Sequence, residues 1–454
     1  MEKNKKSSFS GRLGYVMAVA GSAVGLGNIW RFPYLAAKYG GGTFLFTYVI
    51  LALTVGFALL VSETALGRKT GNNPIKAYKI LGAKKLKIGG WLNSIIPMLI
   101  VPYYCVVGGW VCKYLFEYLR GSSQILTQDT YFSNFIANPI SPAFWLVVFA
   151  VLTFIVVIKG VEKGIEKVSK ILMPILVVIA IFISIYGLMT PGAIEGLKYY
   201  IIPDFSKFSI MTVIAAMGQM FYSLSIGMGI LFTYGSYMKK ETFIEESTKN
   251  VEIFDTAIAI MAGLMIIPAV FAFSGGDPDT LQAGPALMFI TIPKVFASMG
   301  FGTFAGVMFF LLVLFAALTS SIALTESAVS TFEDELGWSR KKSTVLCGVI
   351  MIALGSLSSL GYGPLANVKI IGMQFLDFFD FLTNSVMMPI AAIATCLFVS
   401  RVVGVKRIEE EVTYGGGTFK RRKVFLFMIQ YLCPIFAGII LLSSVANAFG
   451  WISM

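Results

Sequence analysis

The sequence predicts an all-α protein that crosses a membrane many times, and three observations lead to this fold class. Hydrophobic residues make up 57% of the 454 residues and charged residues only 13%, about half the share found in a typical soluble domain. Apolar runs of about 20 residues, the length of a membrane-spanning helix, recur along the whole chain. The charges cluster between these runs, so the net charge of +12 indicates membrane topology and not a nucleic-acid partner.

The composition also argues against an enzyme. The chain contains no histidine, so it has no imidazole base and no Ser-His-Asp or Cys-His nucleophile. No paired catalytic carboxylates and no cluster of metal ligands stand in its sequence. The five cysteines lie in or beside apolar runs without CxxC spacing, which favours buried thiols over a disulfide framework or a metal centre. They are Cys105, Cys112, Cys347, Cys396 and Cys433.

Eleven apolar runs predict eleven membrane helices. Their approximate bounds are 13–37, 42–66, 90–118, 142–158, 171–190, 210–237, 253–274, 301–329, 344–360, 371–400 and 424–452. Several exceed the length needed to cross a bilayer, so we expect them to tilt, bend or project. The chain then divides into an N-terminal segment 1–11, a membrane core 12–400, a basic loop 401–423 and a last helix 424–454.

The basic residues predict the orientation of these helices. If the N-terminus lies inside and the spans alternate, all but eight of the 36 lysines and arginines fall on the inner side. Cytoplasmic loops carry this excess, so we expect a multi-pass protein of the cell inner (plasma) membrane with a cytoplasmic N-terminus and an extracellular C-terminus. No short apolar stretch with a small-residue cleavage site follows the polar first residues, and we therefore expect no removed signal peptide.

The first and sixth spans are interrupted by small and polar residues. The first contains GSAVGLGN at 21–28 and the sixth SLSIGMG at 223–229. Small residues also allow close helix packing, but the added Ser and Asn favour helices that unwind at these points. Unwound backbone is tolerated in a membrane only where it lines a cavity, and its free amides and carbonyls attract anions and cations. The breaks are five spans apart, as an inverted repeat of 12–190 onto 209–400 requires.

The motif at the first break resembles the signature of the neurotransmitter:sodium symporters. It comprises RLG at 12–14 and GSAVGLGNIWRFPY at 21–34, followed by GGG at 40–42, ETALGR at 63–68, GQMFYSLS at 218–225 and LTSS at 318–321. The likeness extends over about residues 9–400. It implies a leucine-transporter-like fold, with a 5+5 inverted repeat and broken helices 1 and 6, in the bacterial eleven-span branch. That branch includes transporters of leucine and of several hydrophobic amino acids.

The resemblance implies two sodium sites built from oxygen ligands, which suit a hard cation. The first comprises the Ala23 carbonyl, the Asn28 side chain, the Ser223 carbonyl and hydroxyl, and Asp255. Relatives often have Asn at the position of Asp255, and a water-facing carboxylate at a helix N-terminus is the alternative reading of this residue. The second site comprises the carbonyls of Gly21, Val24 and Ala316 and the hydroxyls of Thr319 and Ser320.

The same resemblance implies a site for an amino acid. The substrate carboxylate would rest on the amides of Leu26 and Gly27 and on the Tyr104 hydroxyl. The ammonium would meet the carbonyls of Ala23, Tyr222 and Ser223 and the Ser225 hydroxyl. The pocket for the side chain would be lined by Ile100, Tyr104, Tyr222, Ser225, Met228, Ser320 and Leu324. Because this lining is mainly apolar and Met228 is flexible, we expect aromatic and branched aliphatic L-amino acids.

Chloride is not expected to take part. Tyr48, Gln219 and Ser223 resemble three chloride ligands of some relatives, but Ala259 stands where the fourth ligand is a serine. Ala259 cannot donate a hydrogen bond to an anion, and Asp255 places a fixed negative charge one turn away. We therefore expect chloride-independent transport.

Two pairs of charges resemble the gates of the family. Arg31 and Asp380 would close the outer side above a lid of Tyr104 and Tyr222, and Lys6 and Asp334 would close the inner side. Glu63 is expected to hold amides freed by the unwound segments. In the fifth span, Gly164 and Pro174 have the spacing at which bacterial relatives unwind, although a tolerated kink explains the proline equally well.

These expectations describe a sodium-coupled symporter that works by alternating access, with two sodium ions, an amino acid and the lipid bilayer as its partners. A substrate-gated channel or an amino-acid sensor on the same fold is the alternative. The sequence leaves the preferred amino acid, the sodium stoichiometry, proton counter-transport and the oligomeric state open.

Overall fold

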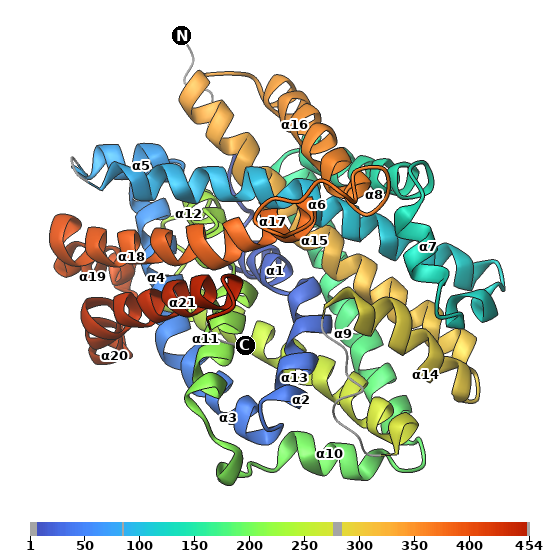
Figure 1. Cartoon of the computed structure of the whole chain (residues 1–454). Helices are drawn as coiled ribbons and strands as arrows, with labels where there is room; N and C mark the ends of the chain where they lie inside the picture. Colours follow the sequence, from blue (N-terminus) through green and yellow to red (C-terminus); the bar gives the residue numbers. More distant parts are fainter. Residues whose placement is uncertain (1–6, 84–85, 276–283, 452–454) are drawn as a thin grey trace.

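Long apolar helices make up almost all of the regular structure (Figure 1). The computed structural model describes residues 7–83, 86–275 and 284–451. Within these ranges, the only β-structure consists of two isolated bridges, Gly41 with Pro203 and Ile370 with Met373. The predicted all-α fold class is therefore confirmed.

Nine helices of the described chain are long and apolar enough to cross a membrane. They are Gly42–Thr70 (α3, η2 and α4), Lys87–Leu119 (α6), Ser141–Ile158 (α8), Val161–Leu188 (η4 and α9), Ile244–Ser274 (α13), Gly302–Leu336 (α15), Arg340–Leu360 (α16), Phe375–Val403 (α17, η8, α18 and η9) and Arg422–Ala448 (α20, η11 and α21). The shorter helices include α5 (Pro74–Ile80), α7 (Tyr131–Ala137), α10 (Ala193–Ile201), α14 (Ile292–Ser298) and α19 (Val405–Val412).

The two remaining predicted spans are broken where the sequence predicts. The first consists of α1 (Arg12–Ala23) and the continuous pair η1 (Gly27–Arg31) and α2 (Phe32–Lys38), bent by 54°. The sixth consists of α11 (Ile210–Ser223) and α12 (Ile230–Ser236), separated by the non-helical residues 224–229. α11 and α12 are each too short to cross a membrane alone. With the first broken pair counted as one span, the described residues contain up to ten spans, and α11 and α12 lie where the remaining predicted run, 210–237, is expected.

The backbone of the sixth span explains its break. Gly227 and Gly229 have φ angles of 74° and 69°, in the left-handed region that glycine adopts without steric cost. Ser225 also has a positive φ, of 55°, which is unfavourable for a residue with a side chain. An α-helix cannot continue through these three residues, and strain at Ser225 marks the break as a candidate functional segment.

The broken helices are enclosed by the other spans. α1 packs against α9, α13 and α15, and α12 packs against α4, so that α1 lies near the middle of the view in Figure 1. α6 is the most buried span, with 83% of its apolar window inside the protein, whereas only 28% of the α20–α21 window is buried. α20–α21 therefore offers most of its apolar surface to lipid.

The fifth span does not unwind at its proline in this structure. α9 (Lys167–Leu188) continues as an α-helix through Pro174. Irregularity is confined to its first turns, where Gly160 has a φ of 87° and η4 (Val161–Glu166) is a π-helix. Pro174 is thus a tolerated helix residue here.

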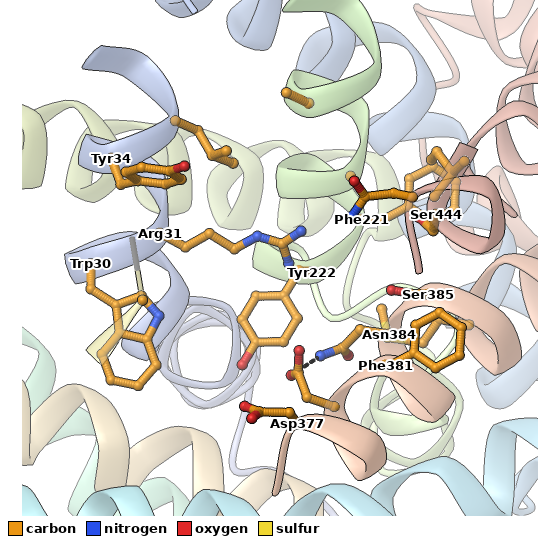
Figure 2. A pocket seen from close by; sticks show the side chains of 18 of the residues that line it. Trp30, Arg31, Tyr34, Phe221, Tyr222, Asp377, Phe381, Asn384, Ser385 and Ser444 are labelled. Carbon is orange, nitrogen blue, oxygen red and sulfur yellow. Dashed lines mark hydrogen bonds between the residues drawn. The ribbon is translucent and has the colours of Figure 1, made fainter. Parts of the chain in front are cut away.

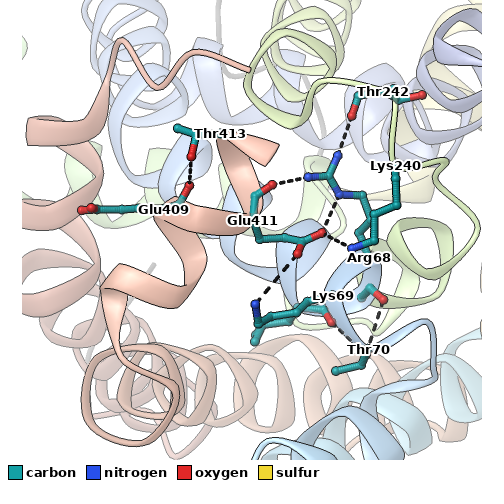
Figure 3. A network of polar contacts seen from close by, with 10 residues as sticks. Arg68, Lys69, Thr70, Lys240, Thr242, Glu409, Glu411 and Thr413 are labelled. Atoms are coloured by element: carbon teal, nitrogen blue, oxygen red, sulfur yellow. Dashed lines mark hydrogen bonds and ion pairs between the residues drawn. The ribbon is translucent and has the colours of Figure 1, made fainter. Parts of the chain in front are cut away.

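A network of ion pairs and hydrogen bonds joins the loop 401–423 to the end of α4 and to the segment after α12 (Figure 3). Glu411 on α19 is buried and accepts a hydrogen bond from Arg68 at 2.8 Å and from Lys240 at 2.6 Å. Arg68 also donates to the carbonyls of Thr242 and Glu411. The network joins the end of α4, the segment after α12 and the loop, so the loop is an ordered part of the fold.

Candidate functional site

A buried carboxylate lies between the two helix breaks. Asp255 on α13 is fully buried, so the alternative of a water-facing carboxylate is wrong. Its oxygens lie 2.8 and 2.9 Å from the Ser223 hydroxyl, 2.8 Å from the Asn28 amide nitrogen and 3.1 Å from the Tyr48 hydroxyl. Among the described residues, no Lys or Arg forms an ion pair with it. A carboxylate inside a membrane that has only neutral donors attracts a cation.

The residues predicted for the first sodium site thus come together from three helices. Asn28, Ser223 and Asp255 are in direct contact, and Ala23, the last residue of α1, lines the same small cavity as Asn28. The Asn28 side-chain oxygen accepts from the Gly25 backbone N–H at 3.2 Å, so its nitrogen faces the carboxylate. An ion at this position would require the Asn28 amide to present its oxygen instead.

The residues predicted for the second sodium site also come together. The Ser320 hydroxyl on α15 lies 3.4 Å from the Gly21 carbonyl and 3.2 Å from the Val24 carbonyl. The Thr319 hydroxyl lies 3.2 Å from the Ala316 carbonyl. Gly21 faces Thr319 so closely that a Cβ at Gly21 would lie 3.2 Å from the Thr319 Cβ. Ser320 thus joins α15 to the carbonyls at the end of α1, and Thr319, whose hydroxyl bonds within its own helix, faces Gly21 across the same seam.

A small cavity of about 20 Å³ lies beside both clusters. Leu26 reaches the same place from the break, since its backbone N–H donates to the Tyr104 hydroxyl at 3.1 Å. The volume suffices for about one water molecule, so an amino acid needs the walls to separate. The lining includes Ala23, Gly27 and all seven residues predicted for the side-chain pocket: Ile100, Tyr104, Tyr222, Ser225, Met228, Ser320 and Leu324.

A much larger vestibule of about 490 Å³ opens on one side of this cavity (Figure 2). Tyr104 and Tyr222 line both spaces and separate them. The Arg31 guanidinium lies 5.6 Å from the centre of the Tyr222 ring, and Asp380 accepts a hydrogen bond from Asn384 at 2.6 Å. In the described part of the chain, no ion pair joins Arg31 to Asp380, so the predicted outer pair faces an open space.

The opposite side, called the inner side below, is closed around Phe9. Phe9 is buried, donates its backbone N–H to the Tyr237 carbonyl at 3.1 Å and packs edge-on against Tyr15, Tyr234 and Tyr237. Of the predicted inner pair, Lys6 lies outside the described residues. Asp334 accepts a hydrogen bond from the Asn73 backbone N–H at 2.9 Å. The protein is therefore open toward Arg31 and closed toward Phe9.

Two buried side chains hold the amides freed in the sixth span. Glu63 accepts from the Gly227 backbone N–H at 3.0 Å, which confirms the role predicted for it at the sixth span. Asn93 on α6 accepts from the Gly229 backbone N–H at 3.3 Å, and the sequence reasoning did not identify this residue. The feature of the sequence that could have identified Asn93 is a polar amide side chain within a long apolar span.

Where some relatives have residues that bind chloride, this chain has the carboxylate of Asp255. Tyr48 and Ser223 both contact Asp255, and Gln219 donates to the Gly27 carbonyl at 3.1 Å. Ala259 is buried one turn after Asp255 on α13 and offers no polar group.

Buried oxygens at two helix breaks, below a vestibule on the side of Arg31, are typical of a membrane transporter of the broken-helix type. The chain belongs to the sodium:neurotransmitter symporter family, whose model matches residues 6–123 and 131–450. It is thus a multi-pass, sodium-dependent transporter and not an enzyme.

Similar proteins cover the chain almost completely. The sodium-dependent transporter YhdH of Bacillus subtilis is 34% identical over 448 residues, which make up 98% of each chain. A sodium-dependent transporter of Haemophilus influenzae is 33% identical over 455 residues, covering 97% of this chain and 98% of that one. The crystal structure of MhsT in complex with L-phenylalanine is 37% identical and superposes with a TM-score of 0.87, over 97% of this chain and 100% of the other.

Gly27 offers a direct test of the lid. A Cβ at this position would lie 2.4 Å from the Tyr222 ring, so Gly27→Ala must displace the ring. Overpacking of this kind costs about 1–3 kcal/mol, and we expect substrate binding, measured with a radiolabelled amino acid, to weaken by about 5- to 150-fold. Gly438→Ala is the matched control, because no atom lies within 4 Å of that position. Unchanged affinity in Gly27→Ala would contradict this role of the lid.

Proposed function

We propose that the protein couples the entry of sodium to the uptake of hydrophobic L-amino acids, by alternating access and without chloride. The observation that carries the proposal is the arrangement around the small cavity. A buried carboxylate, backbone groups that side chains hold in place of a helix ladder, and an apolar wall meet there, and these are the three features that a cation, an amino-acid backbone and an apolar side chain require. The similarity to a structure that holds L-phenylalanine supports the same conclusion.

The substrate would bind with its charged end toward the first break. Its carboxylate would replace the Tyr104 hydroxyl at the Leu26 amide and also meet the Gly27 amide. Its ammonium would face the carbonyls on the other side of the cavity. Ile100, Met228 and Leu324, all buried, would contact the side chain. Burial of a Leu or Phe side chain stabilises binding by about 1.5–3 kcal/mol, whereas a charged side chain would lose its hydration with no partner.

Two sodium ions would link the broken helices to their neighbours. One would lie between Asn28, Ser223 and Asp255, where the carboxylate balances its charge without an added anion. The other would bridge the carbonyls of α1 and the hydroxyls of α15. Because each ion binds oxygens from different helices, each would stabilise the arrangement in which these helices are close.

The direction of transport follows from the predicted topology. By the positive-inside rule, the N-terminal segment and the loop 401–423 would lie in the cytoplasm and the C-terminus outside. The vestibule at Arg31 would then face outward, and Phe9 would close the cytoplasmic side. We propose that Arg31 and Asp380 approach each other when the vestibule closes, and that Lys6 and Asp334 separate when the inner side opens.

Uptake of radiolabelled amino acids into proteoliposomes tests the proposal. An inward sodium gradient should drive accumulation above equilibrium, and unlabelled Phe, Trp, Leu and Ile should compete better than Gly, Asp or Lys. A preference for glycine or for a charged amino acid would contradict the assigned pocket. Sodium-dependent flux without accumulation would indicate the channel alternative, and binding without flux would indicate the sensor.

A further inference from the structure

Glu166, at the inner end of the fifth span, holds the segment that leads into α1. Its carboxylate accepts hydrogen bonds from both the backbone N–H of Ser10, at 2.8 Å, and the Ser10 hydroxyl. Lys170, one turn further along α9, donates to the same carboxylate at 2.5 Å and to the Ser10 hydroxyl at 3.2 Å. Glu166 is only 2% exposed. This contact therefore joins two segments that are 156 residues apart in the sequence.

Gly14 makes the contact sterically possible. A Cβ at Gly14 would lie 2.3 Å from the Glu166 carboxyl carbon and 2.4 and 2.6 Å from its two oxygens. The carboxylate thus occupies space on α1 that only glycine leaves free. α1 has no side-chain cap and no acidic residue in its first turn, so Glu166 supplies from another helix the negative charge that a helix N-terminus favours.

Ser10 is held from a second side as well. The Lys239 ammonium, just after α12, donates to the Ser10 carbonyl at 2.9 Å. The start of α1 is therefore tied both to the fifth span and to the inner end of the sixth. The other end of α1 carries Gly21, Ala23 and Val24, whose carbonyls are assigned to the sodium sites. α1 cannot swing away from these neighbours, and so expose the sites to the inner side, while the contacts of Ser10 persist.

We propose that Glu166 is a positioning residue of the transport cycle: together with Ser10 and Gly14 it holds the inner half of α1 in its closed position, and loss of this contact is a step in opening the inner side. The inference rests on the proposed alternating access. It adds a residue that touches neither substrate nor ion but sets how often the inner side opens.

Three substitutions separate this role from a general loss of stability. Glu166→Gln removes the charge, and Gly14→Ala displaces the carboxylate without changing any charge. Gly11→Ala is the matched control, because it also adds one methyl group near the start of α1, yet no atom lies within 4 Å of that position. A cysteine introduced by Ser330→Cys on α15 reports whether the inner side is open. Ser330 is buried and lies one turn after Glu326, whose carboxylate accepts a hydrogen bond from Tyr237, one of the aromatic residues around Phe9.

Labelling of this cysteine by a bulky, membrane-impermeant thiol reagent should be faster in both test variants. Removing a charged hydrogen-bond pair shifts a two-state equilibrium by a factor of about 5 to 30, and we expect labelling to accelerate by that factor. The double variant should be no faster than Glu166→Gln alone, because both changes remove one contact. With Gly11→Ala added, the cysteine at position 330 should be labelled at the same rate as in the protein that carries Ser330→Cys alone. All five native cysteines are buried, so the reporter-free protein gives a low background.

The effect of sodium on the labelling rate distinguishes a role in the transport cycle from a merely structural role, which sodium would not influence. The ions would bind between α1 and its neighbours, so saturating sodium should slow labelling of both test variants back toward the control rate. Equal labelling of all variants, acceleration in only one of the two test variants, or acceleration that sodium does not reverse would each overturn the inference. Failure of the proposed function is distinguishable, because it would appear as absent sodium-driven uptake in the unmodified protein.

Discussion

Replacing Asp255 with Asn should abolish sodium-driven uptake in chloride-free medium while leaving the protein folded. The two side chains have nearly the same shape, and an amide oxygen can still accept from Ser223, Asn28 or Tyr48, the present partners of the carboxylate. The negative charge is lost, and the oxygen that becomes an NH2 group can donate to the Tyr48 hydroxyl instead of accepting from it. An unbalanced sodium ion in a buried site costs roughly 3 kcal/mol or more, so the apparent sodium affinity should fall by about 100-fold.

Anion replacement and a second substitution provide the controls. In the unmodified protein, replacing chloride with gluconate should leave uptake unchanged. In Asp255→Asn combined with Ala259→Ser, a hydroxyl returns to the fourth position of the chloride site of relatives, and chloride should restore part of the uptake. The midpoint of thermal unfolding in sodium-free buffer should not fall in Asp255→Asn, because the substitution removes a buried charge that has no charged partner among the described residues. Loss of wild-type uptake in gluconate would contradict the assignment.

Local chemistry explains why the two helix breaks were predictable from the sequence. Gly227 and Gly229 are needed where φ is positive, and the polar residues that accompany them mark a cavity. Glu63 was predictable for the same reason, since a carboxylate in an apolar span needs donors. The residues of the proposed sodium sites followed from the motif, because each of them belongs to or adjoins a quoted run of that motif or its counterpart on α13.

Contacts between distant segments were not predictable in this way. Ser10 and Glu166 both belong to polar stretches that resemble ordinary solvated segments, and neither residue type shows that the two lie together. The charge clusters predicted the topology but not their partners, so the position of Glu411 between Arg68 and Lys240 appears only in the folded chain. The small volume of the central cavity depends on the conformation of the whole bundle, which no local pattern encodes.

Replacing Glu411 with Ala should produce the largest loss of stability among substitutions in the segment 401–423. Glu411 is the carboxylate to which Arg68, Lys69 and Lys240 are paired, as Figure 3 shows. Its removal leaves the buried Arg68 guanidinium with carbonyl acceptors alone. Breaking one partner of a buried ion pair costs roughly 3–5 kcal/mol, and the midpoint of thermal unfolding in detergent should fall accordingly. Glu410→Ala, at the next residue toward the N-terminus and exposed, should change stability by less than about 0.5 kcal/mol.

The same network should make stability depend on pH in the acid range. Burial alone would raise the pKa of Glu411, but hydrogen bonds and charge from Lys240 and Arg68 outweigh it and hold the pKa below its ordinary value. A carboxylate with a depressed pKa stabilises the folded state fully above its unfolded pKa, and this contribution disappears as the pH falls through the lower, folded pKa. The stability difference between the unmodified protein and Glu411→Gln should therefore be constant from pH 8 to about 5 and shrink below about 4. A difference that stays constant down to pH 3 would show that the carboxylate charge does not hold the loop.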